Sequence, residues 1–224
     1  MNPRIRDAAD LLRNKRNILI YSGAGLDADS GVPTFDERIS DSLVDWGIDR
    51  WRNDAEWRRE VWSMYSMYAD LKPNAAHDAI LQLVDAGVAD HVTSNVTGLS
   101  VGATELCGSA MELELEWVNG ERLTRPNVTF IGEHLPSGPM EEYFWLQARM
   151  DALLIVGASP LIGIWMAAAL HAKANDIPIV VINKNPEPIW SEFTDVMIQD
   201  SAVSALPKLV GLLQSDVQAQ GGEL

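Results

Sequence analysis

The chain has 224 residues, of which 47% are hydrophobic, so it is long enough to bury one substantial core. Its 32 Asp and Glu residues outnumber its 17 Lys and Arg residues, which gives a formal net charge of −15. Because this charge repels polyanions, we expect no nucleic-acid partner and no anionic membrane partner.

The first element predicted by the sequence is an amphipathic helix within residues 1–17. Its apolar positions recur at helical spacing and are Ile5, Ala8, Ala9 and Leu12. The segment has no continuous apolar run, so it is not interpreted as a secretory signal. The run from Asn17 to Tyr21 is apolar and β-branched and stops at a glycine cluster, which predicts a first strand that feeds a ligand loop.

Two helices are predicted next. Residues 41–71 are rich in Trp, Arg and acids, and one stripe of them has helical spacing: Trp57, Val61, Met64, Tyr65 and Tyr68. We interpret this aromatic stripe as core packing. A second helix is predicted to start at Pro73 and to end at Gly87, where glycine accepts a left-handed cap. Its predicted buried stripe is Ala76, Ile80, Leu83 and Val84.

The remaining sequence alternates strands and helices. Strands are predicted at 91–94, 111–118, 127–132, 152–156, 177–183 and 195–199, and helices at 140–150, 161–175 and 202–213. In the strand at 111–118, acidic and apolar residues alternate, which predicts one wet face. The apolar segment from Ala152 is interrupted by glycines and Pro160, so we interpret it as a buried strand and a helix rather than a membrane span.

This alternation predicts an α/β fold, a Rossmann-like parallel sheet with helices on both faces. We expect a single nucleotide-binding domain over 1–215, with insertions at about 37–72 and 107–126 that form a reduced small module, and a disordered tail at 216–224. Ligands of such sheets bind beyond the carboxyl ends of the strands. The loops after Tyr21, Ser94, Val156 and Ile182 should therefore meet.

The glycine cluster carries the first functional signal. The segment Gly23 to Phe35 reads GAGLDADSGVPTF and begins with GxGxxA, a pattern whose glycines let the backbone turn tightly and approach a pyrophosphate. A dehydrogenase of this type has a second strand with a ribose-binding acid about 20 residues on. Here that region is rich in Trp and Arg and is predicted helical, which disfavours a dehydrogenase.

The longer segment resembles the sirtuin signature GAGxSxxSGIPxFR. Further sirtuin-like motifs follow in the family's order at 72–80, 93–99, 125–136, 156–159 and 181–183. The resemblance implies a Rossmann-type domain that binds NAD, or an ADP-ribose-like nucleotide, across the strand ends. The implied cofactor-binding residues are Gly23, Ala24, Gly25, Asp27, Phe35, Asn95, Gly157, Ser159 and Asn183. Asn95 is also the implied catalytic residue that holds the nicotinamide-side ribose.

Several positions depart from the family pattern. The general-base histidine of the family's HG dipeptide is Cys107 here, and a neutral thiol is a poor base at neutral pH. His134 is considered as a replacement base, whereas His77 is expected to hydrogen-bond within the fold. The other substitutions are Thr97 for the nicotinamide-binding Asp, Ser100 for the following His, Asp36 for an Arg and Asp27 for a Ser.

The family's zinc module is also expected to be missing. The chain has one cysteine, and only 17 residues separate Cys107 from Arg125, without a CxxC pair. We therefore predict no metal site, and the single cysteine favours a cytoplasmic location.

Three functions remain open. The first is an NAD-consuming transferase or glycohydrolase that cleaves the nicotinamide-ribose bond and passes ADP-ribose to water, a peptide or another acceptor. The second is a non-catalytic sensor of NAD or ADP-ribose. The third is an NAD-dependent lysine deacylase with a non-standard base. Asp27 and Asp36 weaken anion binding unless one of them is held on a sugar hydroxyl.

Overall fold

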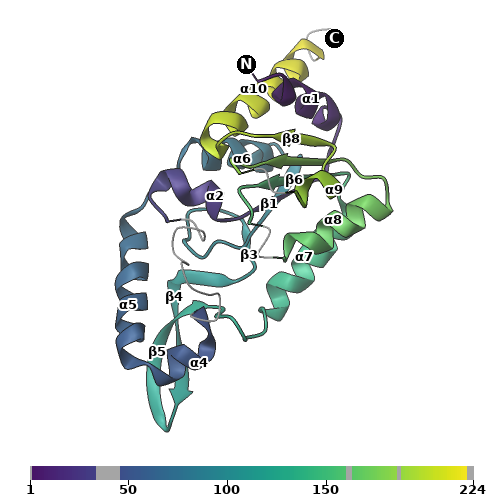
Figure 1. Cartoon of the computed structure of the whole chain (residues 1–224). Coiled ribbons are helices and arrows are strands. Elements are labelled where there is room, and N and C mark those ends of the chain that lie inside the picture. Colours follow the sequence, from purple (N-terminus) through teal and green to yellow (C-terminus); the bar gives the residue numbers. More distant parts are fainter. Residues whose placement is uncertain (1, 34–45, 160–162, 186–187, 221–224) are drawn as a thin grey trace.

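The computed structural model describes residues 2–33, 46–159, 163–185 and 188–220 (Figure 1). Within them a parallel sheet has the strand order β3-β2-β1-β6-β7-β8. The strands are β1 (Ile18–Ser22), β2 (Ala89–Thr93), β3 (Thr104–Glu105), β6 (Ala152–Val156), β7 (Ile179–Ile182) and β8 (Val196–Ile198). All residues of β1 and β6 are buried, as expected for central strands covered on both faces. The predicted α/β Rossmann-like fold is confirmed.

Helices cover both faces of the sheet (Figure 1). Ile18 and Ile20 of β1 join a core with α1 (Pro3–Leu12), α6 (Ala75–Asp85) and α10 (Ala202–Gln220). Leu19 and Tyr21 point the other way, into a core with α7 (Ser137–Arg149), α8 (Trp165–Ala174) and α9 (Trp190–Phe193). The stripe predicted for the first helix, Ile5, Ala8, Ala9 and Leu12, is fully buried.

A smaller unit with its own core lies beyond the carboxyl ends of the central strands (Figure 1). It contains α4 (Ile48–Asn53), α5 (Ala55–Ser66), a 3-10 turn (Met67–Asp70) and a hairpin of β4 (Gly108–Val118) and β5 (Glu121–Val128). The aromatic stripe of α5 packs in this core rather than against the main sheet. After β1, the chain enters this unit through α2 (Ala24–Asp27) and the turn Ala28–Ser30.

A buried guanidinium fixes the hairpin, which as a two-stranded sheet would be only marginally stable alone. Arg125 of β5 contacts Glu114 at 3.0 Å and Glu116 at 3.3 Å on the paired strand. It also contacts Glu133 at 2.7 Å and lies over the ring of Phe130. The cluster therefore ties the hairpin to the segment 130–133.

Three predicted elements differ in the structure. Helix α6 begins at Ala75 rather than Pro73, because the Asn74 side chain accepts from the Ala76 N–H and caps the helix. The strand predicted at 127–132 is instead β5, since the chain leaves the sheet once its pairing with β4 ends at Val128. The predicted single wet face of β4 is wrong as well: Leu113 is 62% and Trp117 72% exposed, because the hairpin projects beyond the core.

The C-terminal helix also extends further than predicted. Helix α10 runs to Gln220, beyond the predicted helix end at residue 213. Residues 221–224 lie outside the described part of the chain. No helix in the described ranges is long and apolar enough to cross a membrane.

Candidate functional site

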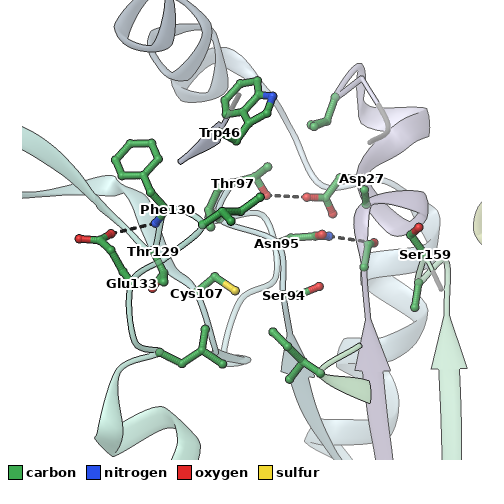
Figure 2. A pocket seen from close by; sticks show the side chains of 18 of the residues that line it. Asp27, Trp46, Ser94, Asn95, Thr97, Cys107, Thr129, Phe130, Glu133 and Ser159 are labelled. Atoms are coloured by element: carbon green, nitrogen blue, oxygen red, sulfur yellow. Dashed lines mark hydrogen bonds between the residues drawn. The ribbon is translucent and has the colours of Figure 1, made fainter. Parts of the chain in front are cut away.

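A cavity of about 390 Å³ lies where the sheet meets the smaller unit (Figure 2). The loops after β1, β2 and β6 form one wall, with Gly23, Ala24, Ser94, Asn95, Ala158 and Ser159. The opposite wall is aromatic and contains Trp46, Tyr65, Tyr68 and Phe130. The loop after β7 joins the first wall through Asn183, whose Nδ2 donates to the Ala158 carbonyl at 2.8 Å. The predicted convergence of the four loops is thus observed.

Three glycines allow two of these loops to touch. The Gly25 N–H donates to the Gly157 carbonyl at 2.8 Å, and the Gly23 N–H donates to the Val156 carbonyl at 3.0 Å. A Cβ on Gly25 would lie 2.6 Å from the Gly157 Cα, and Gly157 itself has φ +57°. These amides are therefore used inside the protein, so the glycines serve loop contact rather than direct donation to a pyrophosphate.

Asn95 is held in a defined orientation. Its Nδ2 donates to the Gly23 carbonyl at 3.0 Å, and its backbone N–H donates to Thr93 Oγ1 at 3.1 Å. The side chain is mostly buried and lines the cavity. With the nitrogen engaged, Oδ1 is the amide atom that remains for a ligand.

A buried histidine supports this arrangement from behind. The Ser22 hydroxyl donates to Thr93 Oγ1 at 2.9 Å and lies 2.8 Å from His91 Nε2, so the histidine must donate to the serine. Burial lowers the pKa of His91 to about 3, which keeps the ring neutral. His91, Ser22 and Thr93 therefore form a chain of hydrogen bonds that ends at the Asn95 backbone.

A second histidine supports Asp27. The Oδ1 of Asp27 lies 3.0 Å from His77 Nε2, and Thr97 Oγ1 donates to Oδ2 at 2.6 Å. All three side chains are buried. The prediction that His77 hydrogen-bonds within the fold is confirmed. Asp27 lines the cavity, yet its two oxygens already accept from protein groups.

Cys107 also lines the cavity (Figure 2). Burial raises the pKa of its thiol to about 11. At neutral pH the group is therefore an uncharged thiol that accepts a proton poorly. The structure places Cys107 at the site but gives it no means of acting as a base.

Cys107 should react slowly with iodoacetamide because the reactive species is the thiolate. A rise in pKa from 9.0 to about 11 lowers the thiolate fraction about 100-fold at neutral pH, so alkylation should be slower by about that factor than in a cysteine peptide. Mass spectrometry over time measures both rates. A rate equal to that of the peptide would show that the thiol is accessible and that its pKa is not raised.

Other predicted residues fall away from the cavity. His134 is exposed and does not line it, although its neighbours Glu133 and Leu135 do. Phe35 and Asp36 lie outside the described residues. Ser100 faces a smaller cavity of about 50 Å³ behind the site, shared with His77 and His91. In the described ranges no group of three or more His, Cys, Asp or Glu is arranged to hold a metal ion.

Sequence reasoning missed most of the aromatic wall. Tyr65 and Tyr68 lie on the stripe interpreted as core packing, and they pack in that core while lining the cavity. Phe130 and Glu133 belong to the sirtuin-like segment 125–136, which was the available signal for them. Trp46 offered no comparable pattern.

The chain is similar in sequence to proteins that share one name, NAD-dependent protein deacylase. The chain is 31% identical to an NAD-dependent protein deacylase of Aeropyrum pernix, over 94% of this chain and 98% of the relative. It is 33% identical to NAD-dependent protein deacylase 2 of Pyrobaculum aerophilum, over 91% of this chain and 94% of the relative. No family model matches the chain.

Solved structures agree on the fold. A structure solved in work on the mechanism and regulation of Sir2 enzymes superposes with a TM-score of 0.82 at 25% identity, covering 96% of this chain and 99% of the other. A complex of Sir2 with a p53 peptide and NAD+ has a TM-score of 0.80 at 21% identity, covering 95% and 99%. The match extends over nearly the whole length of each protein.

Proposed function

The chain belongs to the sirtuin (Sir2) family of NAD-dependent protein deacylases, and from this we propose that it consumes NAD by cleaving the bond between ribose and nicotinamide. The observation that carries the proposal is the fixed amide of Asn95 in a cavity at the carboxyl ends of β1, β2 and β6. A side chain already oriented for a sugar needs no rearrangement when the sugar binds.

The residues of the cavity fit a nicotinamide dinucleotide. The glycines of the two touching loops keep side chains away from the strand ends, where a Cβ would meet backbone at 2.5–2.9 Å. Asn95 would hold the ribose next to nicotinamide, and Ala24, Ser159 and Asn183 would hold the remainder. When bound, NAD supplies a ribose carbon whose bond to nicotinamide breaks with the electron pair on nicotinamide, while an acceptor oxygen bonds to that carbon.

The acceptor is either water, which then loses a proton to solvent, or an acyl oxygen of a peptide. Solved Sir2 proteins bind a p53 peptide with NAD+ and a myristoylated histone peptide, which supports a peptide acceptor. Lysine deacylation would require a base other than Cys107, whose thiol is neutral. His134 is exposed and does not line the cavity, so we do not assign it the role of that base. We therefore rank transfer of ADP-ribose to an acceptor, or hydrolysis, ahead of deacylation.

The neutral thiol at position 107 also favours a second candidate, a sensor that binds NAD or ADP-ribose without turnover. Calorimetry with both nucleotides separates the candidates when combined with a turnover assay. Binding without nicotinamide release identifies a sensor, and absence of binding at millimolar concentration rejects it. We further propose that the chain forms one nucleotide-binding domain with a small module, binds no zinc and is cytoplasmic.

Replacing Asn95 by Ala should lower the rate of nicotinamide release from NAD on the order of 100-fold, as for loss of one preorganised hydrogen-bonding group. Chromatography of released nicotinamide measures the rate. Asn175→Ala, at the exposed end of α8, is the matched control and should keep the wild-type rate. Equal rates in Asn95→Ala and wild type would reject the role of Asn95, and no release by the wild type would reject the enzyme.

A further inference from the structure

Asp27 combines features that its partners alone do not explain. It is a carboxylate with 0% side-chain exposure, yet it forms part of the cavity wall beside Asn95 and Thr97 (Figure 2). A buried charge is unfavourable unless hydrogen bonds or an opposite charge compensate it. The groups that compensate the charge of Asp27 therefore determine how strongly the cavity attracts a charged ligand.

The start of helix α6 sets the protonation of the histidine that faces Asp27. The Asn74 N–H donates to His77 Nδ1 at 3.2 Å, so this nitrogen carries no proton. The proton must be on Nε2, which donates to Asp27 Oδ1. His77 is therefore neutral in this geometry. Since Thr97 is neutral too, Asp27 is oriented by two dipoles and paired with no cation.

The other carboxylate of the cavity is compensated differently. Glu133 accepts from Arg125 at 2.8 and 2.7 Å, and this bidentate pair cancels its charge. No Lys or Arg is among the described residues that line the cavity.

We propose that Asp27 is the charge-selecting residue of the cavity and favours a dinucleotide whose nicotinamide ring is cationic over one whose ring is neutral. The inference rests on the proposed binding of NAD. A fixed carboxylate in a site of low dielectric attracts a cationic ring strongly, whereas the neutral ring of NADH gains nothing from the same charge. Asp27 thus acts through its field and not as a ligand of a sugar hydroxyl.

The sirtuin motifs suggest how the charge reached this position. They carry a Ser where this chain has Asp27 and an Asp where it has Thr97. The structure pairs these two side chains at 2.6 Å. Relative to the sirtuin motifs, the carboxylate and the hydroxyl are therefore exchanged across a single hydrogen bond. The double variant Asp27→Ser with Thr97→Asp should place the carboxylate at position 97 and keep a negative charge in the cavity wall.

Calorimetry with NAD+, NADH and ADP-ribose tests the proposal. The wild type should bind NAD+ at least 10-fold more tightly than NADH. Asp27→Asn should lose that preference while its affinity for ADP-ribose changes less than threefold. The double variant should keep the preference, and Asp29→Asn, exposed two residues further along the loop, is the matched control.

Two outcomes overturn the proposal. If the wild type binds NAD+ and NADH with equal affinity, the proposal is overturned by that result alone. This holds even if thermal melting shows that the variants do not fold. An Asp27→Asn protein that is folded and keeps the preference overturns the proposal as well. A preference for NAD+ without nicotinamide release leaves the role of Asp27 intact and rejects only the proposed turnover, so the two failures are distinguishable.

Discussion

Gly157→Ala is expected to lower the free energy of unfolding by about 2–5 kcal/mol, the sum of an overpacked contact and a left-handed backbone. A Cβ at this position would lie 2.5 Å from the Gly25 carbonyl carbon and 2.7 Å from the Leu26 nitrogen, both backbone atoms that cannot rotate away. The residue also has φ +57°, which an L side chain rarely adopts. Urea unfolding followed by circular dichroism measures the change.

Gly138→Ala is the matched control for this substitution. Apart from its chain neighbours and the backbone of its own helix, nothing lies within 4 Å of a Cβ built on Gly138, which is in the first turn of α7. Alanine should therefore be neutral there or stabilising by up to about 1 kcal/mol. A loss below about 1 kcal/mol in Gly157→Ala would mean that the two loops separate easily, contrary to the tight contact described above.

His91 should make the protein sensitive to acid. Its pKa is about 3 in the folded state and 6.5 for the free side chain, so the unfolded chain binds more protons between these values. The contribution of neutral His91 to the free energy of unfolding is fully present above pH 6.5. It declines as the pH falls, by about 1.4 kcal/mol per pH unit at most. This amounts to about 2 kcal/mol at pH 5 and approaches 5 kcal/mol near pH 3.

The variant His91→Asn, which keeps a polar side chain near Ser22, should show a flatter decline. Urea unfolding of both proteins at pH 7, 6 and 5 isolates the contribution of His91 as the difference between their curves. His134→Asn, at an exposed position, is the control and should follow the wild-type curve. Parallel curves for His91→Asn and wild type would show that the ring titrates in the folded state, and hence that the buried chain to Asn95 opens in acid.

The site thus has two buried histidines with separate tasks. His91 supports the loop that carries Asn95, and His77 orients the carboxylate of Asp27. Neither histidine lines the main cavity, and both border the small cavity behind it. Substitutions at either position should therefore alter the cavity indirectly, through the hydrogen bonds of their partners.

The sequence determined the elements of this protein because their signals are local. Apolar spacing predicted α1, β1 and β6, and the alternation of strands with helices predicted which loops meet at the strand ends. The predicted ends of elements were wrong where a capping residue or a paired strand, rather than the local pattern, determines where the element starts or stops. Asn74 caps α6, so the helix begins at Ala75 rather than at Pro73, and pairing with β4 sets the extent of β5.

Only the tertiary structure decided the chemistry of the site. Thr97 meets Asp27 across 70 residues, and His91 meets Ser22 across 69, so nothing local in the sequence links them. The glycines after β1 were expected to let the backbone approach a pyrophosphate, but the Gly23 and Gly25 N–H groups donate to carbonyls at the end of β6 and just after it. Hydrogen-bond partners of this kind depend on strand register and loop approach, which arise only when the sheet assembles and distant segments compete for the same donors.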